Sequence, residues 1–154
     1  MGNKFKINSL AHAIDFALRD SITIVAKDAN VWFKQSFAKE GFTDENFKSW
    51  KPRKNQIRSS FSRLKKNNVN TKPTLVKSGK LKNSIKINAI TKLKVILSSN
   101  LPYSAIHNDG LNGKAWGKYP FKMPKRQYMG NSRKLERMSV AKIISKIKTA
   151  IKNV

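Results

Sequence analysis

Apolar residues recur at helical spacing near both ends of the chain. Near the N-terminus, an apolar stripe within residues 9–39 is formed by Ile14, Leu18, Ile22, Val25, Ala29, Trp32 and Phe33. Near the C-terminus, a stripe within residues 132–152 is formed by Leu135, Met138, Ile143, Ile144, Ile147 and Ile151. Because residues three and four positions apart share one helical face, the pattern predicts a long N-terminal helix and a C-terminal helix. Asn8 or Ser9 is the expected N-cap of the first helix, and Gly41 marks its expected end.

The middle of the chain alternates apolar and polar residues. Positions 85 and 87 are apolar within 84–90, and positions 93, 95 and 97 are apolar within 93–99. Such alternation predicts an antiparallel hairpin with one buried face. Shorter helical pieces are expected at 54–66, at 79–84 with Ser78 as cap, and at 103–107, where Pro102 opens the helix and Gly110 ends it.

The remaining segments are expected to connect these elements. Residues 41–54 form a connection whose aromatic residues at 42, 47 and 50 anchor it to the core. Residues 67–74 and the Gly- and aromatic-rich stretch 110–122 are expected to be loops, and 120–130 an extended segment. The fold class that follows is α+β: a small, mostly antiparallel sheet packed with a long N-terminal helix and a C-terminal helix. A length of 154 residues is typical of one domain, here 1–154.

Positive charge is concentrated in the later two thirds of the chain. Lys and Arg number 33 and Asp and Glu number 8, so the net charge is +25. Residues 1–50 hold seven basic and six acidic residues, whereas 51–154 hold 26 basic residues and only Asp109 and Glu136. Such an excess destabilises a compact chain unless a negative partner is near, and nucleic acid is the usual polyanion. The alternative is a lysine-rich surface that reflects an AT-rich genome, since Asn and Ile are also abundant.

The residues that most enzymes need are scarce. The chain has no cysteine and two histidines, His12 and His107, neither of which is set in a triad-like or metal-ligand pattern. The two acidic residues after position 50 are 27 positions apart, which argues against a two-metal nuclease. No apolar run approaches the length of a membrane span. We therefore expect a structural or binding protein that is not an enzyme, has no cofactor or metal, and makes no membrane contact.

Four motifs, in order, resemble one known family. They are Phe47-x-x-Trp50-Lys-Pro, Leu75-x-x-Ser-Gly-x-Leu-x-x-Ser-Ile85, Tyr103-Ser-Ala-Ile-His-Asn-Asp-Gly110 and Met123-Pro-Lys-Arg-Gln-Tyr-Met-Gly130. This order resembles the phage virion morphogenesis family, the tail-completion (neck, head–tail joining) proteins of Mu-type and related tailed phages. The chain departs from the family pattern in having Ser78 where Thr is usual before the glycine, and Gln127 before Tyr128. The residues expected to maintain the motif structure are Trp50, Gly79, Leu81, Tyr103, His107 and Gly110.

The resemblance implies a role and a set of partners. Family members are structural parts of the virion, so this chain is expected at the neck or tail, and in the host cytoplasm during assembly. It implies a homo-oligomeric ring, a hexamer or dodecamer, that contacts portal, adaptor or tail-tube proteins and surrounds genomic DNA without reading its sequence. Candidate DNA or lumen contacts are Arg58, Arg63, Lys65, Lys66, Lys86, Lys92 and Lys94. Candidate subunit contacts are Trp116, Tyr119, Pro124 and Arg126. The alternative function is that of a non-specific, nucleoid-type DNA-binding protein.

Overall fold

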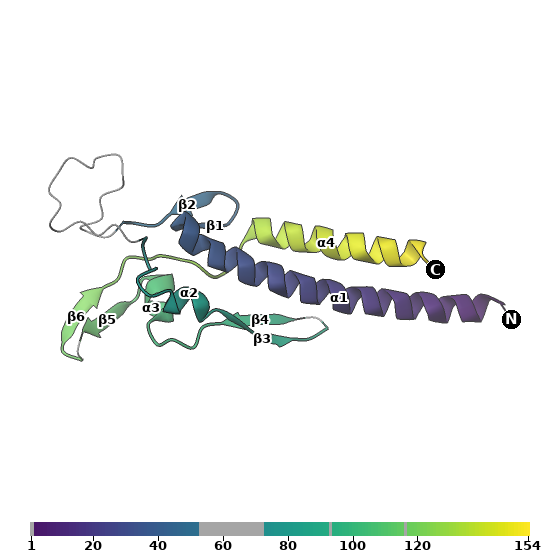
Figure 1. The fold of residues 1–154 in the computed structure, drawn as a ribbon, viewed down its shortest axis with the longest axis horizontal. Coiled ribbons are helices and arrows are strands. Elements are labelled where there is room, and N and C mark those ends of the chain that lie inside the picture. Colours follow the sequence, from purple (N-terminus) through teal and green to yellow (C-terminus); the bar gives the residue numbers. More distant parts are fainter. Residues whose placement is uncertain (1, 53–72, 93, 116) are drawn as a thin grey trace. The chain divides into compact units, whose positions relative to one another are not determined.

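A computed structural model describes residues 2–52, 73–92, 94–115 and 117–154 (Figure 1). The chain divides into two compact units. Unit 1 comprises Met1–Trp32, Lys86–Ser98 and Ser132–Val154, and unit 2 comprises Phe33–Ile85 and Ser99–Asn131. The elements are α-helices and short antiparallel strands, which confirms the predicted α+β class.

Unit 1 contains most of helix α1 (Gly2–Lys39), a hairpin of β3 (Lys86–Ile90) and β4 (Val95–Ser98), and helix α4 (Arg133–Lys152). One face of α1 is buried through Ala17, Ser21, Ile22, Ala26 and Ala29. Ala17, the adjacent pair Ser21 and Ile22, Ala26 and Ala29 follow one another at three to five positions, so they form a continuous stripe along the helix. The small side chains in this stripe let neighbouring elements pack close to the helix backbone.

Helix α1 begins earlier than the sequence pattern predicts. It starts at Gly2, so Asn8 and Ser9 are helical and neither is the N-cap. The reason is that residues 3–8 contain no helix breaker, and both polar residues are tolerated inside a helix. The C-terminal end agrees with the prediction, since the helix ends at Lys39 and Glu40 adopts a left-handed conformation just before Gly41.

The predicted hairpin and C-terminal helix of unit 1 are both present. Strands β3 and β4 pair antiparallel from Lys86↔Ser98 to Ile90↔Val95, with an irregularity between Ile87 and Ala89. Ser132 caps α4, because its Oγ accepts a hydrogen bond from the Leu135 amide at 3.2 Å. Along α4 the apolar stripe is only half covered within the described residues, and Val140, Ile144 and Ile151 remain 46–49% exposed.

Unit 2 contains the end of α1 and the remaining short elements. These are β1 (Gly41–Thr43), β2 (Phe47–Ser49), α2 (Lys80–Asn83), α3 (Ser104–Asp109), β5 (Asn112–Ala115) and β6 (Tyr119–Lys122). Its largest buried side chains include Phe37, Trp50, Ile85 and Tyr128, which come from four separate stretches of the sequence. The core of unit 2 is therefore built by segments that are short individually but are fixed by contact with one another.

Several local expectations for unit 2 are wrong. Residues 41–54 contain the β1–β2 hairpin and 110–122 contain the β5–β6 hairpin, so the described strands form three two-stranded sheets in place of one. Strands of three or four residues are too short to show alternation, and glycines that suggest loops also permit hairpin turns. The N-cap of α2 is Gly79 and not Ser78. Phe47 is 51% exposed, whereas Phe42 and Trp50 are buried as expected.

Candidate functional site

Two of the sequence motifs and the end of α1 meet at Tyr128. The Tyr128 side chain is completely buried. Its ring lies 4.9 Å from that of Phe37, and Phe37 in turn meets Trp50 edge-on at 5.6 Å. Aromatic pairs in these geometries add stability beyond the apolar area that they bury. The Phe47–Pro52 and Met123–Gly130 motifs are thus joined through one aromatic cluster in unit 2.

Hydrogen bonds bring the third motif into the same block. The Trp50 indole donates to the Gln127 carbonyl at 2.6 Å. The Asn108 side-chain oxygen accepts from the amides of both Tyr128 and Met129, each at 3.0 Å. The Tyr128 hydroxyl is 2.5 Å from the Ser104 hydroxyl. Segments that are remote in the sequence are therefore fixed relative to one another by hydrogen bonds between partly buried groups.

Burial also sets the protonation of the tyrosine at this centre. Removal from water raises the pKa of the Tyr128 phenol above its ordinary value, and the hydrogen bond with Ser104 opposes this rise only in part. The phenol consequently stays neutral at physiological pH and keeps its hydrogen-bonding proton. Asn108 and Tyr128 were not singled out by sequence reasoning. Their signal in the sequence is membership of two quoted motifs, Tyr103–Gly110 for Asn108 and Met123–Gly130 for Tyr128.

The end of the Tyr103–Gly110 motif needs a glycine for two reasons. Gly110 has φ 74° and caps α3 in the left-handed conformation, as the sequence predicts. A Cβ atom at this position would lie 2.7 Å from the backbone nitrogen of Lys125. The glycine thereby allows the Met123–Gly130 segment to run directly against the end of α3, where the Arg126 amide donates to the His107 carbonyl at 2.9 Å.

Arg126 is held within unit 2, and its expected role as a subunit contact stays a prediction. Its side chain is 6% exposed, and its Nε donates to the Lys51 carbonyl at 3.0 Å within unit 2. A guanidinium that is held in this way ties two segments of its own chain together. Pro124, two residues earlier, is half-buried, so its expected subunit contact stays a prediction.

The Leu75–Ile85 motif is a second structural piece of unit 2. Gly79 has φ 71° at the start of α2, and Leu81 and Ile85 are buried. The Ser84 and Ser99 hydroxyls are 2.7 Å apart, which connects the motif to the chain that leaves β4. Tyr103 and His107 lie on one face of α3 with their rings 6.0 Å apart in an edge-on pair, as their four-residue spacing predicts.

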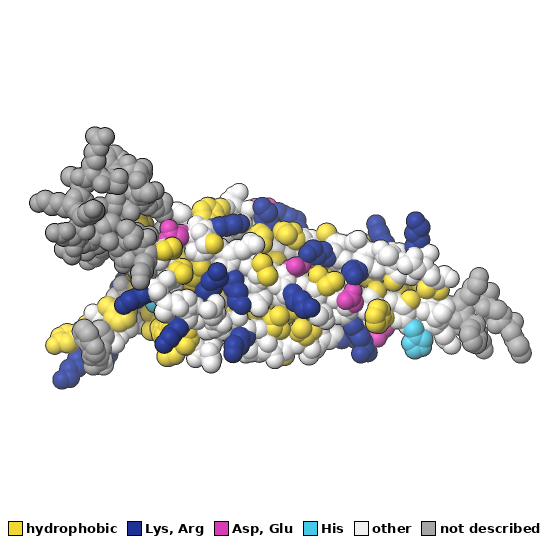
Figure 2. Space-filling view, viewed as in Figure 1, with side chains coloured by type: hydrophobic (Ala, Val, Ile, Leu, Met, Phe, Trp, Pro, Cys, Tyr) yellow, Lys and Arg dark blue, Asp and Glu magenta, His cyan; other side chains and the backbone are white. Residues whose placement is uncertain are grey.

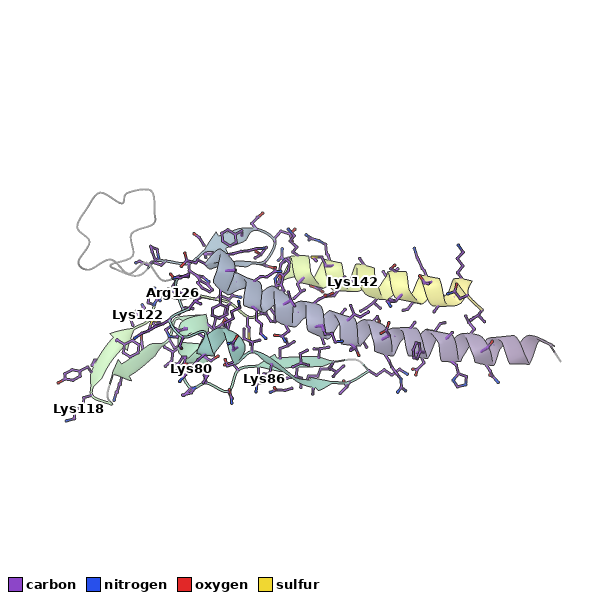
Figure 3. The ribbon with its side chains drawn as sticks, viewed as in Figure 1. Lys80, Lys86, Lys118, Lys122, Arg126 and Lys142 are labelled. Atoms are coloured by element: carbon purple, nitrogen blue, oxygen red, sulfur yellow. The ribbon has the colours of Figure 1, made fainter. Side chains whose placement is uncertain are left out.

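In unit 1, the acidic residues of α1 hold lysines from other elements. Asp28 pairs with Lys142 of α4, and Asp20 pairs with Lys146 of α4 at 2.8 Å. Figure 3 labels Lys142 on that helix. Asp15 pairs with Lys92, which follows β3. The hydrogen bonds from Lys92 and then Arg19 hold the pKa of Asp15 below its ordinary value. The balanced charge of the N-terminal third therefore serves to neutralise cations contributed by later segments.

This pairing distinguishes among the expected DNA contacts. Lys92 is engaged by Asp15, whereas Lys86 and Lys94 are exposed and make no ion pair with the described residues. Arg58, Arg63, Lys65 and Lys66, and the helix expected at 54–66, lie outside the described residues. On the face shown in Figure 2, Lys and Arg side chains are spread over the described elements, and few acidic side chains lie between them.

The β5–β6 hairpin has two different faces. Across the ladder, Asn112 pairs with Lys122 and Lys114 with Pro120, while Gly113 pairs with Phe121 and Ala115 with Tyr119. Because paired residues lie on the same face, the lysines occupy one face and the aromatic residues the other. Tyr119 is 64% exposed, in agreement with its expected place at a subunit contact, which stays a prediction; Trp116 lies outside the described residues.

The described residues contain no cluster suited to bind a metal ion, since no group of three or more His, Asp or Glu side chains is placed to hold one. His12 is exposed on α1, and His107 is half-buried in α3. The arrangements that the structure does show are a buried block of motif segments and a basic surface.

A comparison with protein families identifies the chain. The model of the phage virion morphogenesis family matches residues 34–148. The chain belongs to the phage virion morphogenesis family. No curated protein and no solved structure gave a significant match.

The family match confirms the resemblance on which the sequence expectations depend. The matched region contains all four motifs, including the three segments of the block around Tyr128. As a member of this family, the chain has a structural or assembly role in the morphogenesis of a phage virion. In the part of the chain that the structure describes, no helix combines the length and apolar character needed to cross a bilayer.

Proposed function

We propose that this chain is a structural protein of a tailed-phage virion that forms a ring at the neck, the head–tail junction, around the DNA channel. The observation that carries the proposal is the family match over residues 34–148, which gives the chain a part in virion morphogenesis. The finer placement at the neck follows the tail-completion proteins that the motifs resemble. In this role the chain would touch portal, adaptor or tail-tube proteins and pass the genome through its ring.

The distribution of charge supports a position beside DNA. The net charge is +25, and α1 supplies the acidic partners of only three lysines from other elements in the described ion pairs. Lys86 and Lys94 remain exposed on and beside the β3–β4 hairpin, where a polyanion can reach them. A lumen lined by such side chains attracts phosphates at any base sequence, which suits a channel that every part of the genome must pass.

Electron microscopy and mass spectrometry of purified particles test this function. The proposal expects the chain in the particle, at a fixed copy number, in density between head and tail. Its absence from particles, together with its recovery on DNA from extracts of infected cells, would overturn the neck assignment in favour of a nucleoid-type DNA-binding protein. A place elsewhere in the virion would refute the neck assignment but keep the structural role.

A further inference from the structure

The β5–β6 hairpin, residues 112–122, forms an arm of unit 2 that is fixed at its base. No side chain described within the arm is buried, and most are exposed. At the base, the Met123 amide donates to the Leu111 carbonyl at 3.3 Å, and the backbone of Lys125 lies close against Gly110. Figure 1 shows the two strands extending away from α3 of the same unit. The arm is therefore held at one end and exposed along its length.

One face of the arm carries positive charge. Lys114 lies opposite Pro120 in the ladder, and Lys122 lies two residues beyond Pro120 on β6, so the two lysines share this face. Both are exposed, and neither forms an ion pair with the described residues. A third lysine, Lys118, lies at the tip (Figure 3). No acidic residue occurs from position 110 to position 135, so the neighbouring sequence supplies no carboxylate.

The two lysines of this face are close enough to repel each other. Diagonal neighbours in an antiparallel ladder lie about 7–8 Å apart. Like charges at that range repel even in water. A hairpin of two short strands is only marginally stable by itself, so the repulsion acts on an element with little stability to lose. An anion between the two ammonium groups would replace the repulsion by two attractions.

Unit 1 treats its lysines differently. Lys92, Lys142 and Lys146 each form an ion pair with a carboxylate of α1, and these pairs join separate elements of the unit. Lysines that hold the fold together are thus neutralised within the chain. The lysine face of the arm has no such ion pair with the described residues, which indicates that its charge serves a partner outside the chain.

The form of the arm favours duplex DNA as that partner. A two-stranded ribbon fits the major groove of B-DNA, which is bordered by the phosphates of both strands. We propose that the β5–β6 arm binds the phosphate backbone of duplex DNA through Lys114, Lys122 and the tip residue Lys118, without reading the base sequence. The opposite face of the arm, which holds Tyr119, takes no part in this contact. This inference rests on the proposed function, since it names an element that meets the genome in the channel.

The salt dependence of DNA binding tests the arm. Each phosphate contact contributes about 0.9 to the slope of log K against log salt concentration, so Lys114→Gln with Lys122→Gln should lower the slope by about 1.8 on a short duplex of arbitrary sequence. The matched control is Lys148→Gln with Lys152→Gln, which removes the same charge from exposed positions of α4. The control should lower the slope by less than about 0.5. Equal changes in the two variants would overturn the inference, because binding would then follow net charge alone.

A single charge reversal separates binding from folding of the arm. Lys122→Glu places a carboxylate diagonal to Lys114, so the repulsion within the lysine face becomes an attraction. Amide hydrogen exchange in the arm should become slower, while affinity for the duplex should fall at least about tenfold. A purely structural role would move the two measurements in the same direction. Unchanged affinity would contradict the inference, whatever the exchange rates are.

The failures of this inference and of the proposed function are distinguishable. If particles hold the chain as a neck ring but the Gln pair in the arm leaves duplex binding unchanged, the arm inference is wrong and the proposed function stands. If that pair also keeps the chain out of particles, the lysine face meets an acidic protein instead of DNA. If the arm carries DNA binding but the chain is absent from particles, the arm inference stands and the neck assignment is wrong.

Discussion

Gly110 and Gly117 share a backbone conformation but differ in their surroundings. Both have φ 74°, yet a Cβ at Gly110 would lie 2.7 Å from the Lys125 backbone nitrogen, whereas one at Gly117 would meet nothing within 4 Å. We expect Gly117→Ala to cost about 1 kcal/mol, the strain of a left-handed residue. Gly110→Ala should cost more than about 2 kcal/mol, because the Met123–Gly130 segment must also move. Urea unfolding of both variants measures the difference, and equal losses would show that the close approach to Lys125 contributes nothing.

Tyr128 gives the molecule a pH dependence of known sign. Burial raises the pKa of its phenol, so the folded state binds this proton more tightly than the unfolded state does. The stability that this tighter proton binding contributes is complete below about pH 10, the pKa of the phenol in the unfolded chain. It is lost as pH rises through the pKa of the phenol in the folded chain. Tyr128→Phe should reduce stability by about 1 kcal/mol at neutral pH, through loss of the bond with Ser104. The free-energy gap between the two proteins should narrow above about pH 10, and a constant gap would contradict the buried-phenol argument.

Among the secondary-structure elements, length decided what could be predicted from sequence. Helices α1 and α4 span 38 and 20 residues, so several apolar repeats define their faces. The β1–β2 and β5–β6 hairpins have strands of three or four residues, in which alternation cannot be recognised. The motif segments were named correctly, but their meeting at Tyr128 depends on the Asn108 side chain accepting two amides 20 and 21 positions away. No local pattern encodes a contact of that kind.

The pairing of α1 with α4 has an electrostatic part that can be measured. Asp28 and Lys142 form an ion pair in which both side chains are partly exposed, so water weakens their attraction. A double-mutant cycle with Asp28→Asn and Lys142→Gln should give a coupling of about 0.5 kcal/mol in dilute buffer. The coupling should shrink toward zero in about 1 M NaCl, where the screening length falls to about 3 Å. The same cycle on Asp20 and Lys146 serves as an internal replicate, because this second ion pair joins the same two helices. A coupling that survives high salt would mean that the pair is packed more tightly than its exposure indicates.

For the whole molecule, two effects of salt oppose each other. Screening weakens the three ion pairs of α1 with other elements, which together contribute about 1.5 kcal/mol at most if each exposed pair is worth about 0.5 kcal/mol. Screening also relieves repulsion among 25 uncompensated positive charges on a chain of 154 residues. Two like charges about 10 Å apart in water repel by about 0.4 kcal/mol, and a chain with this excess contains many such pairs. The repulsion is therefore the larger effect, and salt should stabilise the fold.

We accordingly expect the midpoint of thermal unfolding to rise by about 3 °C or more between about 0.02 and 0.3 M NaCl. For a chain of this size, that rise corresponds to a gain of about 1 kcal/mol in the free energy of unfolding. Replacing Asp15, Asp20 and Asp28 by Asn leaves five acidic residues against 33 basic ones, so the net charge rises from +25 to +28. This variant has lost its ion pairs and gained repulsion, so its midpoint should rise more steeply with salt than that of the parent chain. Calorimetry of both proteins over the same salt series provides the measurement. A midpoint that falls with salt in the parent chain would mean that its attractive pairs outweigh its charge excess, and that the folded chain does not need a polyanion beside it.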